Sequence, residues 1–208
     1  MRTLVIDTAT AACSVALIEG DAVIDHRHEV VGRGHAERLV PMIAELDQQG
    51  RADRIWVDCG PGSFTGIRVG LAAAIGLSIG WSVPVSGYSS MAVIAAAAFV
   101  RHPPADALAV VIEGGHGELF MQHFRRGPEK MDELVSLRPA AVIERLGGRL
   151  AIGSGVRFLH EIAPELPAEN ALPDAADAVL LPVALTALAP RPIYGRAPDA
   201  VPSPRGRA

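Results

Sequence analysis

The sequence is poor in lysine, in aromatic side chains and in cysteine. Lys130 is the only lysine among 208 residues, aromatic residues make up 4%, and the net charge is −4. A chain that binds nucleic acid by itself needs clustered cationic side chains for phosphate contacts, so this composition argues against such a protein. Cys13 and Cys59 have no metal-ligand spacing, which is typical of reduced, buried thiols in a cytoplasmic protein.

Charged residues are few as well, at 20%, whereas half of the chain is hydrophobic. This composition excludes a disordered chain and predicts one or two folded domains. Residues 69–100 carry no charged side chain, but Gly, Ser and Pro84 divide the run, so we expect two buried elements rather than a membrane span. Asp7 interrupts the apolar run that an export signal needs, and we expect a cytoplasmic protein without a membrane anchor.

One order of strands and helices occurs twice along the chain. The first copy comprises strands at residues 2–8, 14–19, 22–30 and 54–58 and helices at 36–47 and 67–80. The second copy comprises strands at residues 108–113, 118–125, 134–137 and 150–152 and helices at 139–146 and from 156. Each copy has the order βββαβα. The sequence therefore predicts an α/β fold of two similar lobes.

The remaining segments connect or follow these two copies. A strand at residues 83–86 and a helix at 89–100 end the first lobe, and a last helix is expected at 174–189. The expected lobes are residues 1–102 and 103–190, followed by a Pro- and Arg-rich tail at 191–208.

The densest motif is the turn at residues 60–70, Gly-Pro-Gly-Ser-Phe-Thr-Gly-Ile-Arg-Val-Gly, between a strand and a helix. Exposed backbone amides at such a helix start suit an anion. A P-loop is excluded, because it needs Gly-Lys-Ser/Thr at the end of the turn and the only lysine is Lys130. The alternative interpretation is that Gly62 and Gly66 make a tight turn while Ser63 or Thr65 caps the helix.

Small residues recur at intervals of four along the helix that follows. Gly66, Gly70 and Ala74 form one row, and Gly76 and Gly80 form a second pair. Such rows allow close approach by a neighbouring element. Composition does not decide whether that neighbour is part of this chain or a partner subunit.

Other motifs argue against catalysis by this chain. Ser78 lies in a Gly-x-Ser-x-Gly pattern, but inside the expected helix rather than on the strand-to-helix turn that a hydrolase requires. His35 is followed four residues later by Leu39, where a helical metal site needs a second ligand. Asp7, Thr8 and Thr10 follow the first strand, where an acid often faces a phosphate or a metal ion.

Four segments together resemble the TsaB (YeaZ-like) family of bacterial tRNA threonylcarbamoyladenosine biosynthesis subunits. They are residues 6–17, residues 35–42, the turn at 60–70 and the closing stretch at 192–199. The resemblance implies the two-lobed actin/Hsp70/sugar-kinase (ASKHA) fold. It also implies a non-catalytic subunit that dimerises with a TsaD-like catalytic subunit, which transfers threonylcarbamoyl to the adenosine next to the anticodon.

In that resemblance, the catalytic relative carries two metal-binding histidines four residues apart, and this chain has His35 at the first position and Leu39 at the second. The resemblance implies that this chain has no catalytic residue, no metal ion and no required cofactor. It leaves open whether ATP or ADP still binds near Asp7, Thr8 and Thr10. A TsaE-like ATPase joins the assembly, and tRNA is bound through the complex. The implied interface residues are His35, Leu39, Ile43, Gly62, Ser63, Phe64, Thr65, Gly66, Arg68 and Gly70.

Several alternatives stay open beside this interpretation. A sugar-kinase-like, ATP-binding enzyme would use Asp7 and the glycine turns, and a peptidase or other hydrolase is the second rival. The chain departs from the family at residues 113–120, Glu-Gly-Gly-His-Gly-Glu-Leu-Phe, where relatives commonly read Asp-Ala-Arg. A homodimer of the isolated chain and a contact between the Arg-rich tail and tRNA are open too. We expect Gly70→Leu to block association and leave the monomer folded.

Overall fold

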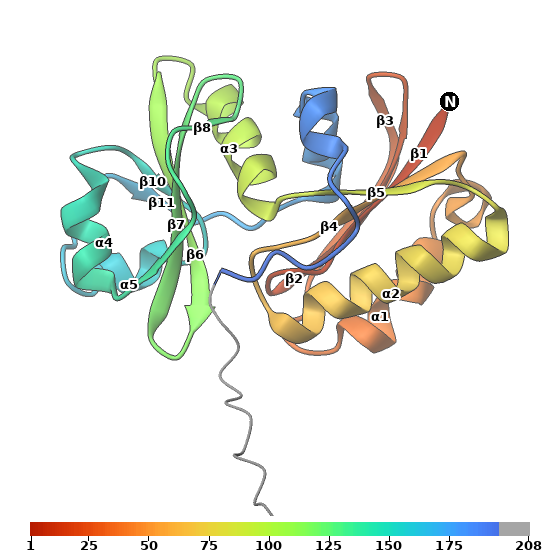
Figure 1. The fold of residues 1–208 in the computed structure, drawn as a ribbon, viewed down its shortest axis with the longest axis horizontal. Coiled ribbons are helices and arrows are strands. Elements are labelled where there is room, and N and C mark those ends of the chain that lie inside the picture. The colour runs from red at the N-terminus through yellow and green to blue at the C-terminus, as the bar shows by residue number, and fades with distance from the viewer. Residues whose placement is uncertain (196–208) are drawn as a thin grey trace, which may run out of the picture.

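Two β-sheets lie side by side, each with helices on its outer face, and a further layer of helices separates them (Figure 1). The structure is a computed structural model and describes residues 1–195. Most of the predicted tail at 191–208 lies outside these residues.

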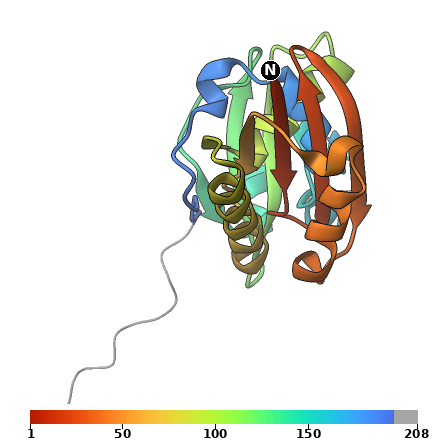
Figure 2. The same ribbon diagram turned by 90° about the vertical axis from the view of Figure 1, so that its right-hand side faces the viewer.

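The first sheet consists of five strands in the order β3-β2-β1-β4-β5. They are β1 (Arg2–Asp7), β2 (Ala12–Glu19), β3 (Ala22–Val30), β4 (Arg54–Asp58) and β5 (Val85–Tyr88). The first three form an antiparallel meander, and β4 and β5 continue parallel to β1. Its outer face is covered by α1 (His35–Ala44) and α2 (Phe64–Trp81) (Figure 2).

Alternation along the strands explains why both faces of this sheet are covered. Leu4 and Ile6 of β1 belong to the core under α1 and α2, whereas Val5 between them belongs to the core between the two sheets. Successive strand side chains point to opposite faces, so an uninterrupted apolar strand requires cover on both sides.

The second sheet follows the same path through its strands, β11-β10-β6-β7-β8, with β9 also paired to β7. Its strands are β6 (Ala107–Gly115), β7 (Glu118–Arg125), β8 (Glu129–Lys130), β9 (Val135–Leu137), β10 (Ala151–Ile152) and β11 (Ala168–Glu169). The short helices α4 (Pro139–Leu146) and α5 (Val156–His160) pack on its outer face. Since β6, β7 and β10 take the places of β1, β2 and β4, the predicted duplication in a two-lobed α/β fold is confirmed.

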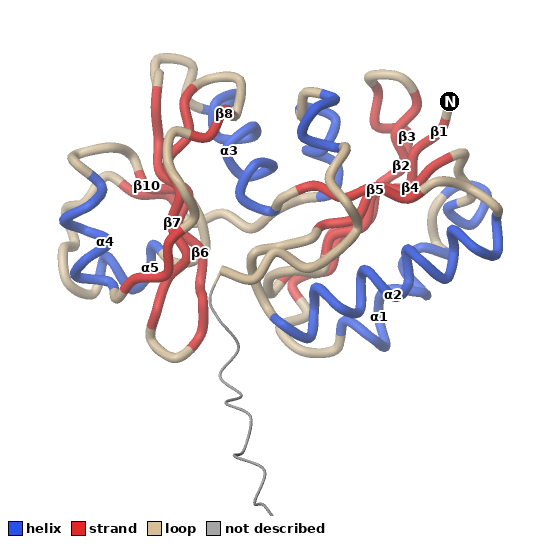
Figure 3. The backbone as a smooth tube through the Cα atoms, in the orientation of Figure 1, coloured by secondary structure: helices blue, strands red, loops and turns tan. Residues whose placement is uncertain are grey.

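The layer between the sheets comes from two distant parts of the chain (Figure 3). It contains α3 (Ser90–Arg101) and the 3₁₀ helices η2 (Ala175–Leu180) and η3 (Val183–Thr186). Helix α3 is buried at every position from Ser90 to Phe99, as its Ala-rich sequence allows. The segment after residue 173 returns to the first sheet, where η2 contacts β1, β2 and β3 and Leu188 pairs with Gly87. Part of the range 103–190 thus packs on the first lobe.

The predicted helix at 174–189 is wrong, because this stretch forms only the two 3₁₀ helices. Pro182 lies between them and can neither donate a helical hydrogen bond nor fit against the preceding turn. Other differences are smaller. Helix α1 ends at Ala44, before the 3₁₀ turn η1 (Asp47–Gly50), and α2 begins at Phe64. The two-residue strands β8 and β11 are too short to show a periodicity, so the sequence did not predict them.

Candidate functional site

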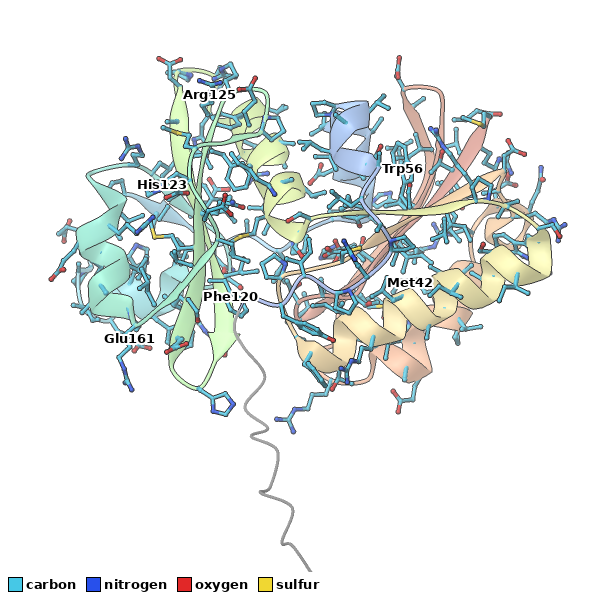
Figure 4. All side chains as sticks on the ribbon, in the orientation of Figure 1. Met42, Trp56, Phe120, His123, Arg125 and Glu161 are labelled. Atoms are coloured by element: carbon cyan, nitrogen blue, oxygen red, sulfur yellow. The ribbon has the colours of Figure 1, made fainter. Side chains whose placement is uncertain are left out.

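A cleft of about 850 Å³ lies between the two lobes. The first lobe contributes residues 9–11 after β1 and the Gly-rich turn before α2. The second contributes the β6–β7 turn at 113–116, and Phe120 lies between the lobes (Figure 4). Ile193, Tyr194 and Gly195 of the returning segment complete the lining. The cleft therefore joins the densest sequence motif to the segment that departs from the family.

The Gly-rich turn docks directly on the backbone that follows β1. A Cβ atom on Gly62 would overlap the carbonyl oxygen of Ala9, and one on Gly66 would overlap that of Thr8. The amide of Ser63 donates to Ala9 O over 2.6 Å, and Thr8 Oγ1 donates to Gly66 O over 2.8 Å. Ser63 Oγ accepts from Gly66 N, as a helix cap does. The tight-turn interpretation of this motif is thus confirmed, with Ser63 as the cap.

The row of small residues in α2 faces the chain's own sheet. A Cβ on Gly70 would lie 2.5 Å from Thr8 Oγ1, and Gly66, Gly70 and Ala74 are all buried. The assignment of Gly70 to a face for a partner is therefore wrong: a side chain added there would meet Thr8 and β1, so we expect Gly70→Leu to destabilise the monomer itself. The second pair is different: nothing lies within 4 Å of a Cβ placed on Gly76 or Gly80.

Several residues assigned to the partner interface lie inside the first lobe instead. His35, Leu39 and Ile43 are buried under α1, and His35 Nε2 lies 3.1 Å from Ala12 O. They are buried because α1 must cover the apolar outer face of the sheet. Of the other assigned residues, Gly66 and Gly70 are buried, Thr65 is exposed, and Gly62, Ser63, Phe64 and Arg68 line the cleft.

A buried carboxyl pair lies behind the cleft, at the ends of the parallel strands β1 and β4. Asp7 and Asp58 are almost completely buried and hydrogen-bonded to each other. Tyr88 donates its hydroxyl to Asp7 Oδ2 over 3.1 Å, and Ser90 donates to Asp58 Oδ2 over 2.6 Å. Burial and the neighbouring Asp58 raise the pKa of Asp7 well above its usual value, and burial raises the pKa of Asp58 to about 6.

This pair changes the candidate nucleotide residues. Asp7 and Thr8 do not line the cleft, because their side chains bond within the lobe, whereas Thr10 does line it. Sequence reasoning missed Asp58 and Tyr88. Asp58 could have been found, because it ends a predicted strand and the carboxyl ends of parallel strands meet at one edge of a sheet. Nothing in the sequence indicated that β5 would bring Tyr88 to the same place.

A cluster of aromatic and cationic side chains lines the mouth of the cleft. The Phe64 and Tyr194 rings are stacked with centroids 5.7 Å apart, and the Arg68 guanidinium lies 3.5 Å from the Phe64 centroid. Arg68 Nη2 donates to the Tyr194 hydroxyl over 3.0 Å. Arg33 also lines the cleft. No sequence pattern joins Tyr194 and Arg33 to this motif, because they lie about 130 and 30 residues away from Phe64 along the chain.

Ser78 and the metal-ligating side chains are the two further candidates for chemistry in residues 1–195. Ser78 lies inside α2, and its hydroxyl donates to Val83 O over 2.6 Å, so it is not the exposed nucleophile of a strand-to-helix turn. Within residues 1–195, no three His, Cys, Asp or Glu side chains are grouped to hold a metal ion. Cys13 and Cys59 are free and buried, as the composition predicted.

Comparison with known proteins places these features in a family. The family model of TsaD, tRNA N6-adenosine threonylcarbamoyltransferase, matches residues 27–153. The chain is 32% identical over 197 residues to the tRNA threonylcarbamoyladenosine biosynthesis protein TsaB of Escherichia coli strain K12, covering 88% of this chain and 83% of that protein. It is 40% identical over 114 residues to TsaB of Haemophilus influenzae, covering 52% and 48%.

Among solved structures, the chain is similar to an uncharacterised protein from Pseudomonas aeruginosa that is described as similar to peptidase YeaZ. That similarity has a TM-score of 0.76 and 29% identity, and it covers 94% of this chain and 99% of the other. The chain belongs to the TsaB (YeaZ-like) family, within the group of proteins that the TsaD family model describes.

Proposed function

We propose that this chain is a non-catalytic subunit of tRNA threonylcarbamoyladenosine biosynthesis that pairs with a TsaD-like catalytic subunit. The family membership supports the pathway. Leu39 supports the non-catalytic role: it stands where the resemblance puts the second metal-binding histidine of the catalytic relative, and it is fully buried in the core under α1. The partner then transfers threonylcarbamoyl to the adenosine next to the anticodon.

The observation that carries the pairing is an apolar surface on the outer side of α1 and α2. Val40, Ile75 and Ile79 expose 62%, 42% and 76% of their surface. Nothing lies within 4 Å of a Cβ placed on Gly76 or Gly80 of α2, which permits another helix to approach α2 closely there. Neighbouring exposed aliphatic residues on two adjacent helices are typical of a protein interface. We name this set of five residues the helical docking face.

The docking face also explains the hydropathy of α2. By length and composition, α2 is the one described helix that could cross a membrane, yet only 28% of it is buried. Its inner side packs on the sheet through Gly66, Ile67 and Gly70. A partner subunit over the outer side accounts for the exposed apolar residues without a membrane, which fits a cytoplasmic protein.

The other members of the assembly follow from the same proposal. A chain of net charge −4 reaches tRNA through the complex, and a TsaE-like ATPase joins it there. The isolated chain can form a homodimer through the same docking face, in competition with the catalytic subunit. No cofactor on this chain is required.

Ile79→Arg tests the proposal, with Ile162→Arg as the matched control. Both isoleucines are exposed, by 76% and 55%, so neither change should unfold the chain. We expect Ile79→Arg to weaken pairing with the TsaD-like subunit about 30-fold or more, because it buries an unpaired charge in the interface. Ile162→Arg should pair normally. Normal pairing by both variants would refute the docking face.

The interlobe cleft favours one rival, a nucleotide-binding enzyme. ATP or ADP would enter the cleft beside Thr10 and the Gly-rich turn. Calorimetric titration of the full chain with ATP, followed by a phosphate-release assay, separates the two. Binding with turnover would support the enzyme, whereas the subunit proposal expects no turnover.

A further inference from the structure

The aromatic and cationic cluster at the mouth of the cleft is not used by the helical docking face. It consists of Phe64, Arg68, Tyr194 and Arg33, and we name it the cleft-mouth cluster. Aromatic residues make up only 4% of the chain, yet Phe64 and Tyr194 are 56% and 46% exposed. The two stacked rings thus leave apolar surface exposed at the cleft, where a ligand can contact it.

The distances within the cluster leave one face of Phe64 uncovered by its two neighbours. Arg68 lies 3.5 Å from the Phe64 centroid and 6.0 Å from the Tyr194 centroid, while the two ring centroids are 5.7 Å apart. If Arg68 and Tyr194 lay on opposite faces of the Phe64 ring, the distance from Arg68 to the Tyr194 centroid would approach the sum of the other two distances. Since it is much shorter, Arg68 and Tyr194 do not lie on opposite faces of Phe64, and the 56% exposure of Phe64 provides surface on which a flat group can stack.

Charge in the cleft favours an anionic ligand. Arg33 is exposed and has no hydrogen bond or ion pair within residues 1–195, and Arg68 uses one nitrogen for Tyr194. The acidic residue that lines the opposite wall, Glu113, is paired with Arg157 over 2.6 Å. Arg68 lies beside the two rings and Arg33 lines the same cleft, so the cleft offers guanidinium groups that can pair with phosphate next to rings on which a base can stack.

The opposite wall of the cleft leaves room for such a ligand. It is formed by the turn Glu113–Gly114–Gly115–His116, in which nothing lies within 4 Å of a Cβ on Gly115. This is the segment in which the chain departs from the resemblance. Its small residues keep the cleft wide opposite Phe64.

We propose that the cleft-mouth cluster binds an unpaired nucleotide of single-stranded RNA, with its base stacked on Phe64 and its phosphates paired with Arg33 and Arg68. The proposal rests on the proposed function, since it gives this subunit a direct contact with the RNA that the complex modifies. Base stacking on aromatic side chains with flanking cations is how proteins hold single strands. A net charge of −4 does not prevent this contact, because only the local charge of the cleft acts on it.

Fluorescence anisotropy of a labelled, unstructured oligoadenylate with the full chain tests the proposal. We expect Phe64→Ala to weaken binding about tenfold or more, since one base loses its stacking partner. Arg33→Ala should weaken it and reduce the slope of log K against log salt by about 0.7, the value for one phosphate of a single strand. Phe158→Ala and Arg125→Ala are the controls, because Phe158 also packs under an arginine and Arg125 is exposed, both away from the cleft.

Two variants separate this proposal from the proposed function. Ile79→Arg should lose the catalytic partner and keep oligonucleotide binding, whereas Phe64→Ala should keep the partner and lose oligonucleotide binding. Binding of ATP without oligonucleotide binding would overturn the RNA assignment. So would oligonucleotide binding that is indifferent to Phe64, or a self-association of the chain that Phe64→Ala abolishes.

Discussion

The buried carboxyl pair predicts an unusual dependence of stability on pH. The Asp7 carboxyl is hydrogen-bonded to Asp58, and burial together with Asp58 raises the pKa of Asp7 well above 3.8. The native chain therefore holds a proton that the unfolded chain releases. Stability from this group is complete below pH 3.8 and falls as the pH rises toward the native pKa of Asp7, by about 1.4 kcal/mol per pH unit for one proton.

Asp7→Asn isolates this effect. The amide has the shape of a protonated carboxyl: it can donate to Asp58 and accept from Tyr88, whose hydroxyl lies 3.1 Å from Asp7 Oδ2. Because the amide does not titrate, we expect the variant to gain stability over the natural chain by about 1.4 kcal/mol per pH unit from about pH 5 up to the native pKa of Asp7. Urea unfolding between about pH 5 and pH 8 measures the difference.

The exposed Asp21→Asn serves as the control and should show no such gain. A difference between Asp7→Asn and the natural chain that is independent of pH would refute the reasoning. It would mean that Asp7 is ionised in the folded state. A difference that falls with rising pH would refute it as well.

The two glycine rows of α2 should respond oppositely to substitution by Leu. In urea unfolding, we expect Gly70→Leu to destabilise the chain by about 3 kcal/mol and Gly76→Leu to stabilise it by about 0.5 kcal/mol. In co-purification, Gly76→Leu should block binding of the catalytic partner. Burial raises the pKa of Asp132, but hydrogen bonds from His123 and Arg145 outweigh it and lower the pKa, so Asp132→Asn should cost about 1–2 kcal/mol at neutral pH and nothing at a pH below that lowered pKa. Burial raises the pKa of Cys13 to about 11 and that of Cys59 to about 12, so thiol labelling near pH 8 should require unfolding.

The sequence allowed most of the fold to be predicted, because long periodic segments decide it. Strand β3 and helix α4 have the predicted bounds, and the duplicated order of elements fixes the two sheets. The returning segment at 174–195 could not be predicted. It is held by distant partners, such as Cys59 O, which accepts from Ile193 N, and no local pattern reports such contacts.

The site was harder to predict than the fold. The Gly-rich turn was found, but its glycines serve the contact with Thr8 and Ala9, and a row of small residues looks the same in sequence whichever neighbour it meets. The sequence therefore did not show that Gly66 and Gly70 face the chain's own sheet, while Gly76 and Gly80 face open space. The side chains that define the exposed side of α2, Ile75 and Ile79, are ordinary aliphatic residues, and only their exposure distinguishes them from core residues.

Under the proposed function, this chain acts in tRNA modification by pairing with a catalytic subunit through the helical docking face. The most direct measurement is the formation of threonylcarbamoyladenosine on tRNA by the TsaD-like subunit, supplied with TsaE-like ATPase and threonylcarbamoyl-AMP. We expect modification with the natural chain and with Ile162→Arg, and loss of both modification and pairing with Ile79→Arg. Modification that proceeds equally well without this chain, or with Ile79→Arg, would contradict the proposed function.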